Sequence, residues 1–118
     1  MMISKDSAEH YTWGDHCDGW HLVKTPGLSV IHERMPPGAA EVRHMHNAAR
    51  QFFFVLSGTA TLEVAGRIEV LGPQQGLEIA PNEPHQMRNA SHEPIEFLVI
   101  SQPPSHGDRV LAPLDEPA

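Results

Sequence analysis

The sequence has few of the features that stabilise or export small secreted proteins. It contains one cysteine, Cys17, so no disulfide can form within the chain. It has no apolar run of about eighteen residues, the length that a membrane span needs. The N-terminal stretch lacks the apolar centre of a signal peptide; it reads MMISKDSAEHYTWGDHC. These absences predict a protein outside the membrane, and the lone thiol favours a reducing cytoplasm.

Basic residues are also scarce. Eight lysines and arginines face fifteen aspartates and glutamates, which gives a formal net charge of -7. A protein that binds nucleic acid neutralises phosphates with a basic surface, and this composition cannot supply an extensive one. We therefore expect a small-molecule ligand and no nucleic-acid partner.

Turn-forming residues are abundant, and no segment shows a sustained helical repeat. Eleven prolines and nine glycines separate short runs that are rich in β-branched and aromatic residues. There are nine such runs, at 20–24, 28–35, 41–46, 51–57, 59–65, 67–71, 76–80, 85–90 and 95–101. Nine short strands at this spacing predict an all-β sandwich or barrel. We expect one barrel domain over residues 20–101, an N-terminal arm over 1–19 and an irregular C-terminal tail over 102–118.

The run QFFFVLS at 51–57 is apolar on both of its faces. Alternation along a strand places Phe53 and Val55 on one face with Gln51, and Phe52 and Phe54 on the other. A small barrel has only one interior, so the outer face needs another cover. We expect a homodimer in which a second subunit covers it, and the alternative is that the terminal segments do so.

Three histidines stand near each other in the strand pattern. His44 and His46 are two residues apart, so on a strand their side chains point the same way, about 6.5–7 Å apart. Two imidazoles at that separation can bind one metal ion. Gln51 has the wrong parity for an unbroken strand, but the intervening NAAR can form a turn that resets the phase. His85 opens a later run; a histidine pair alone is weak evidence, and the joint arrangement carries the argument.

This spacing resembles the first motif of the cupin family. That motif is a glycine, five residues, His-x-His, three or four residues, a glutamate, six residues and a glycine. In this chain Gly38, His44, His46, Gln51 and Gly58 fall on those positions, with four residues before the glutamate position. The departure is Gln51, which stands where the family has glutamate.

The segment APNEPHQMRN is similar to the second cupin motif, Pro-x-Gly-x-x-His-x-x-x-Asn. His85 and Asn89 keep its spacing, while Ala80 replaces the proline and Asn82 the glycine. Asparagine tolerates left-handed backbone geometry, so we expect the turn to survive. The resemblance covers roughly residues 20–101 and implies a single-domain cupin-type β-barrel, a double-stranded β-helix of jelly-roll-like architecture.

The resemblance implies that His44, His46, Gln51 and His85 converge on a metal ion. Glutamine offers a neutral carbonyl oxygen, so all four ligands would be neutral and the ion would keep its full charge. We expect weaker binding than at a carboxylate site and a stronger Lewis acid, which favours an anionic substrate or a bound hydroxide. Zinc, iron, manganese, nickel and copper remain open as the ion. The alternative is a pocket that has lost its metal.

Four further residues are candidates for the wall of a substrate pocket. Phe53 shares the inward face with the ligands, and Met87 and Asn89 share the face of His85. His32 is a candidate acid–base group, because imidazole titrates near neutrality, or else a solvated edge-strand residue. No carboxylate is expected beside the ion, which disfavours proton abstraction by a glutamate ligand.

Three functional hypotheses follow, and the sequence leaves open whether the protein is an enzyme. The first is a metal-dependent enzyme of unassigned reaction, by oxygen activation or Lewis-acid chemistry, acting on a small, polar, anionic molecule. The second is a non-catalytic module that binds a metabolite or a metal. The third is a metal-free sugar-type isomerase that uses His85 or His32 as its acid–base group. Fold and ligands alone do not select the reaction.

Overall fold

The computed structural model describes residues 1–114, which form eleven strands and no helix. The strands are β1 (Glu9–Trp13), β2 (Cys17–Lys24), β3 (Ser29–Met35), β4 (His44–His46), β5 (Arg50–Ser57), β6 (Ala60–Val64), β7 (Arg67–Leu71), β8 (Gly76–Ile79), β9 (His85–Arg88), β10 (Ile95–Gln102) and β11 (Arg109–Leu111). Every one of the nine expected runs overlaps a strand, so the all-β prediction is confirmed. Within this part of the chain, no helix has the length and apolar character needed to cross a membrane.

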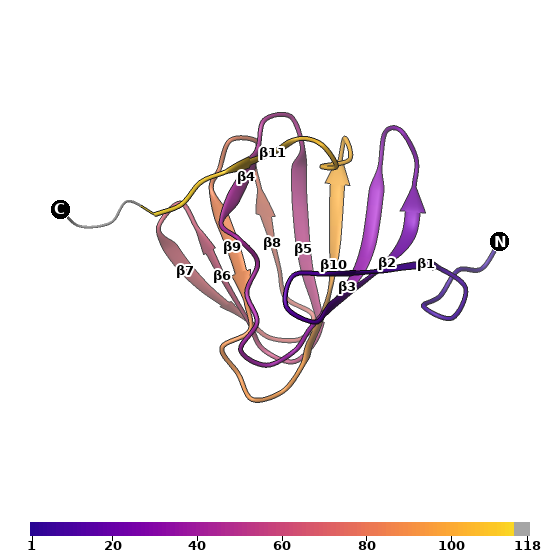
Figure 1. Cartoon of the computed structure of the whole chain (residues 1–118), viewed down its shortest axis with the longest axis horizontal. Coiled ribbons are helices and arrows are strands. Elements are labelled where there is room, and N and C mark those ends of the chain that lie inside the picture. Colours follow the sequence, from indigo (N-terminus) through magenta and orange to yellow (C-terminus); the bar gives the residue numbers. More distant parts are fainter. Residues whose placement is uncertain (115–118) are drawn as a thin grey trace.

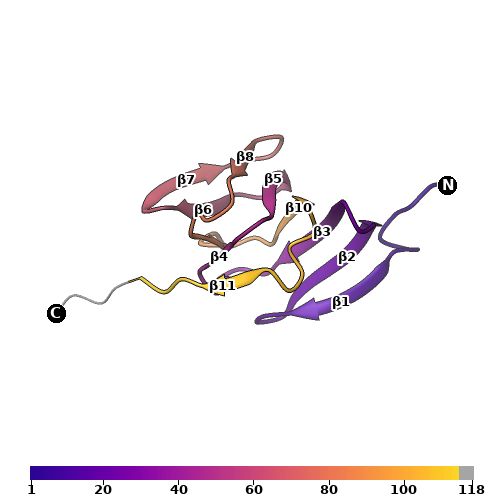
Figure 2. The ribbon, with the colours of Figure 1, turned by 90° about the horizontal axis from the view of Figure 1, so that it is seen from above.

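The strands form two antiparallel sheets (Figures 1 and 2). One has the order β1-β2-β3-β10-β5-β8, and the other has the order β11-β4-β9-β6-β7. The strands β1 and β11 come from the expected arm and tail, and each extends one sheet at its edge. The terminal segments therefore contribute to both sheets, and the division of the chain at residues 20 and 101 stays a prediction.

The hydrophobic core consists of side chains that point inward from both sheets. Val55 and Phe97 of the first sheet and Leu62 and Met87 of the second are at most 1% exposed. Burial of this kind stabilises the fold by about 25 cal/mol per Å² of apolar surface removed from water. Alternation along β5 follows the expected parity, because Phe53 and Val55 are buried while Phe52 on the opposite face is 38% exposed.

Two turns depend on left-handed backbone geometry. Asn82 has a φ of 67°, which confirms that asparagine supports the turn where the family motif has glycine. The Asn82 N–H donates to the His46 carbonyl oxygen at 2.7 Å and so ties the turn before β9 to the end of β4. Gly58 has a φ of 82°, and a Cβ there would lie 2.7 Å from the Pro94 carbonyl oxygen. Only glycine fits at this second position.

Candidate metal centre

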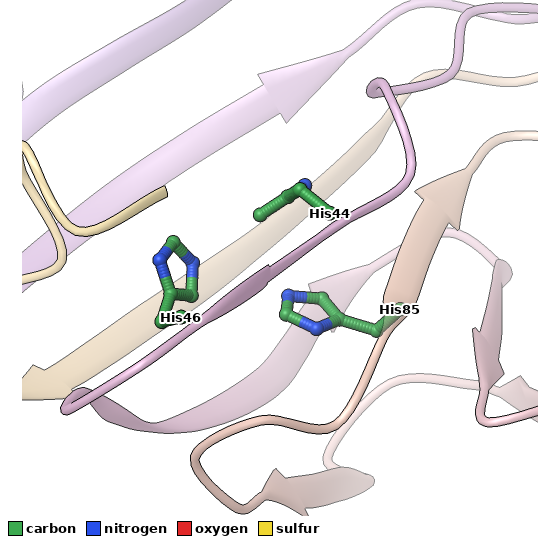
Figure 3. A group of neighbouring side chains, drawn as sticks. All are labelled: His44, His46 and His85. Atoms are coloured by element: carbon green, nitrogen blue, oxygen red, sulfur yellow. The ribbon is translucent and has the colours of Figure 1, made fainter. Parts of the chain in front are cut away.

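Two neighbouring strands of the second sheet bring the three histidines together. His44 and His46 lie on the same side of β4, and His85 at the start of β9 is the direct cross-strand partner of His44. All three are buried, and one ring nitrogen from each lies within 4.8 Å of the others (Figure 3). Such a cluster can hold a metal ion.

Hydrogen bonds set the tautomer of each ring. The Nδ1 atoms lie against backbone carbonyl oxygens: 2.6 Å for His44 with Val42, 3.2 Å for His46 with Asp108 and 2.9 Å for His85 with Glu83. Because a carbonyl oxygen only accepts, each Nδ1 carries the proton and each Nε2 keeps a free lone pair. The Nε2 atoms of His46 and His85 are buried with no hydrogen-bond partner among residues 1–114. They are therefore available as metal ligands.

The environment keeps all three rings uncharged at neutral pH. Burial lowers the pKa of His44 to about 4, despite the favourable hydrogen bond to Val42. Burial likewise lowers the pKa of His46 and of His85. Neutral imidazole is the form that binds a metal, so the site needs no deprotonation step near neutral pH.

Gln51 reaches the same region from the opposite sheet. Its side chain is buried, and its Nε2 donates to Oγ of Ser101, the directly paired residue of β10, at 3.0 Å. This bond orients the amide so that Oε1 is the free end, and Oε1 is buried without a donor in the described residues. A buried acceptor left unsatisfied costs about 1–3 kcal/mol, which a cation would offset. Three imidazole nitrogens and one carbonyl oxygen fit a divalent transition-metal ion.

Asp108, from the expected tail, fixes the turn between His46 and Gln51. Its carboxylate accepts hydrogen bonds of 2.9–3.0 Å from the backbone N–H groups of three turn residues, Asn47, Ala48 and Ala49. Its backbone carbonyl is the one that faces His46 Nδ1. The hydrogen bonds from the turn lower the pKa of Asp108. Sequence reasoning missed this residue, because an aspartate far along the chain carries no local signal of such a contact.

A cavity of about 460 Å³ opens beside the histidines. His44, His46, Gln51 and Phe53 all line it, and the Phe53 ring lies 5.9 Å from the ring of His85. This placement agrees with the expectation that Phe53 borders the ligands. Three of the four candidate ligands therefore border a cavity with space for a small molecule.

The other three expected pocket residues are not among the described residues that line this cavity. Met87 is fully buried in the core. Asn89 is buried and its Nδ2 donates to the carbonyl oxygens of Met35 and Glu93, so it holds a turn. His32 lies on the outer face of its sheet, because the next residue of β3 faces the cavity; there it contacts Glu96 at 2.7 Å.

The cavity wall also contains three charged residues that sequence reasoning did not select: Glu33, Glu41 and Arg109. The expectation that no carboxylate stands near the metal centre therefore overlooked two carboxyls in the same cavity. Strand parity gives the face of Glu33, but it does not tell which residues of a distant strand lie across the cavity from it. Glu41 precedes β4 outside any strand, where alternation does not apply.

Comparisons with known proteins agree with this geometry. The model of the cupin domain matches residues 31–101. Mannose-1-phosphate guanylyltransferase from Klebsiella pneumoniae is 31% identical over 88 residues, which are 75% of this chain and 18% of that enzyme. The chain thus spans less than a fifth of the length of the curated relatives it matches.

Solved structures share the fold. A protein with a double-stranded β-helix domain from Klebsiella pneumoniae superposes with a TM-score of 0.78 at 21% identity, over 96% of this chain and 97% of the other. The cupin domain of an XRE family transcriptional regulator from Enterobacter cloacae gives 0.69 at 26% identity, over 75% and 97%. The expected double-stranded β-helix is confirmed.

Proposed function

The chain belongs to the cupin family, and we propose that it is a metal-dependent enzyme acting on a small, polar, anionic molecule. The observation that supports this proposal is that one ring nitrogen from each of His44, His46 and His85 lies within 4.8 Å of the others. Gln51, whose Oε1 has no donor among the described residues, lines the same cavity as His44 and His46. A bound divalent ion would supply Lewis acidity that polarises an oxygen atom of the ligand.

The charge of the proposed ligand set favours an anion. His44, His46, His85 and Gln51 are all neutral, so no ligand from this set offsets the charge of the ion. Arg109 adds a positive charge to the cavity wall. An anionic group of the substrate would therefore be attracted both by the ion and by this guanidinium.

The decisive experiment is elemental analysis of protein purified without chelator or metal-affinity resin. We expect about one equivalent of a transition metal per chain, and His44→Ala should lose it because one of three nitrogen ligands is removed. The matched control is His32→Ala, since His32 is a partly buried histidine outside the cavity and its loss should leave the metal content unchanged. Unchanged metal in His44→Ala would refute the assignment.

A metabolite-binding module is the second candidate, and the similarity to a regulator's cupin domain favours it. On that hypothesis the metal-loaded protein gains thermal stability from a small anion but converts none. A metal-free isomerase would instead keep its activity in the presence of a chelator. Its suggested base His32 is on the outer face of the sheet, which leaves His85, whose ring lies 5.9 Å from that of the cavity residue Phe53, as the other candidate base.

We also infer that two copies of the chain pair through the outer face of the six-stranded sheet. Trp20, His32, Leu98 and Phe54 form one cross-strand row on that face. Phe52 stacks on Phe54 with ring centroids 6.1 Å apart. Burying apolar surface of this kind against a partner stabilises the assembly. In a two-fold dimer both chains contribute the same face.

A further inference from the structure

Two carboxyl groups in the cavity form no salt bridge within the described part of the chain. Glu33 comes from β3 and Glu41 from the segment before β4, and both line the cavity that contains His44 and His46. Neither forms a salt bridge with any residue of the described chain. Glu63, by contrast, is a buried carboxylate with a structural role. It pairs with Arg43 through two hydrogen bonds. Burying a charge without a salt-bridge partner is costly, so carboxyls without one at a cavity wall point to a functional role and not a structural one.

The absence of a side chain at Gly19 lets the ring of Tyr11 reach Glu33. Tyr11 of β1, Gly19 of β2 and Glu33 of β3 are direct neighbours across three adjacent strands. A Cβ on Gly19 would lie 2.3 Å from Cζ of the Tyr11 ring, so only glycine lets the ring lie across β2. The Tyr11 hydroxyl then donates to Oε1 of Glu33 at 3.3 Å. The arrangement fixes the position of the Glu33 carboxyl.

The two carboxyls have different surroundings. Oε1 of Glu41 accepts a hydrogen bond of 2.8 Å from the Met87 N–H, and the charge of Arg109 also favours its ionised form. Glu33 is faced by Tyr11 from β1, by Cys17 from β2 and by Glu41, and no cation is among these neighbours. Burial raises the pKa of Glu33 to about 8, with a further contribution from the charge of Glu41. Burial raises the pKa of Glu41 to about 7.

We propose that Glu33 and Glu41 form a proton-transfer pair, in which Glu33 donates a proton to an oxygen of the bound molecule and Glu41 accepts one from it. The inference rests on the proposed function only in using the same cavity for the ligand. Burial favours the protonated form of both carboxyls, but only Glu41 has a backbone N–H donor and a nearby guanidinium that favour its ionised form. Carboxyls whose surroundings differ in this way are suited to act as acid and base. The ligand class is a small carbonyl compound with an acidic C–H bond.

The step balances without an oxidant. The O–H bond of Glu33 breaks and its proton bonds to the carbonyl oxygen of the ligand, which receives the π electron pair of the C=O bond as that bond becomes single. The C–H proton of the ligand passes to Glu41, and the electron pair of that bond forms the new C=C bond of an enol. One carboxyl gains the proton that the other loses, so the total charge of the cavity is unchanged. Tyr11 is a positioning residue, because it acts on the ligand only through Glu33.

The first test is a pH titration of the glutamate carboxyl carbons by 13C NMR, in protein stripped of metal with a chelator. Glu33→Gln and Glu41→Gln assign the two signals. We expect the pair to titrate with apparent pKa values near 8 and 7 rather than the ordinary 4.5. Glu41→Gln should lower the pKa of Glu33 by removing a like charge, and Tyr11→Phe should raise it by removing a hydrogen bond to the ionised form.

The second test asks whether the protonated carboxyl is open to a small molecule, and it uses the wild-type protein stripped of metal in the same way. Ethyl diazoacetate esterifies protonated carboxyls: the acid proton moves to the diazo carbon, nitrogen leaves and the carboxylate oxygen bonds to that carbon. At pH 7 we expect peptide mass spectrometry to find the ester on Glu33, with much less at pH 9. Glu33→Gln should lose it.

Two outcomes would overturn the pair: both signals titrating below pH 6, or Glu33 remaining unlabelled at pH 7. Both measurements use metal-free protein and need no turnover, so a failed metal site leaves them intact. Conversely, a normal metal content with ordinary carboxyl pKa values would reject the proton-transfer pair and keep the metal centre.

Discussion

The amide of Gln51 is held by Ser101, its direct partner in the neighbouring strand, through a hydrogen bond of 3.0 Å. This bond leaves the Gln51 oxygen without a donor among the described residues, and Gln51 lines the same cavity as His44 and His46. The serine hydroxyl can rotate, so it can also donate to a carboxylate at the same position. Ser101 could therefore hold a carboxylate at position 51, although the residue there is a neutral glutamine.

Gln51→Glu should therefore tighten metal binding. The substitution adds a negative ligand to three neutral ones, and we expect an affinity gain of about tenfold or more, which is roughly 1.4 kcal/mol. Zinc titration against a competing chelator measures the change. Ser101→Ala is the companion variant, and it should weaken binding because the amide loses the bond that orients it. Equal or weaker binding by Gln51→Glu would mean that residue 51 is not a ligand.

Asp108→Ala should weaken metal binding, although Asp108 is not itself a candidate ligand. Three backbone N–H groups of the turn at 47–49 lose their acceptor, so His46 and Gln51 lose their fixed separation. Loss of such a supporting contact typically lowers metal affinity by about 10–100-fold. Calorimetric zinc titration and thermal unfolding measure the two effects. Asp15→Ala, at an exposed aspartate, is the control and should change neither. Wild-type zinc affinity in Asp108→Ala would contradict this role.

The metal-free protein should lose stability between pH 6.5 and pH 8. The pKa of Glu33 is raised to about 8 and that of Glu41 to about 7, from 4.5, so the folded state binds more protons than the unfolded chain and its stability falls as pH rises through this range. The lowered pKa of His44, about 4, acts in the opposite direction, but only below its ordinary value of 6.5.

The decrease in the free energy of unfolding is at most about 1.4 kcal/mol per pH unit for each proton that the folded state binds in excess. Urea unfolding in the presence of a chelator at pH 6.5 and pH 8 measures it. Glu33→Gln should flatten the dependence, because the substituted residue no longer titrates. A free energy of unfolding that rises over this interval in the wild-type protein would contradict the raised carboxyl pKa values.

Phe54→Glu should dissociate the proposed dimer. The substitution places a charge in the middle of the outer apolar row, where it would have to be buried against the partner copy. Sedimentation velocity should then show a monomer, whereas the wild-type chain sediments as a dimer. Val70→Glu is the matched control, because Val70 is an exposed apolar residue of the other sheet and is 61% exposed. A monomeric wild type, or dissociation by both variants alike, would exclude the interface.

The success of the strand predictions has a physical cause. Runs such as 51–57 and 95–101 alternate between the core and the outer face, and their apolar residues record that burial directly. The sequence did not predict the edge strands β1 and β11, because their residues are mostly exposed and show no alternation of apolar side chains. Asn82 was anticipated correctly, since its side chain is one of the few that tolerate a positive φ.

Spacing along the chain was sufficient to pair His44 with His46, to mark His85 and Gln51 as their partners by resemblance, and to separate the two faces of β5. Only the folded arrangement decided that Glu33, Glu41 and Arg109 share a cavity with His44 and His46. It also decided that Asp108 holds the turn between His46 and Gln51, and that His32, Met87 and Asn89 lie elsewhere. The reason is that alternation and turn chemistry are local properties of the backbone, whereas contacts across a sheet or between two sheets depend on register and packing, which no short stretch of sequence encodes by itself.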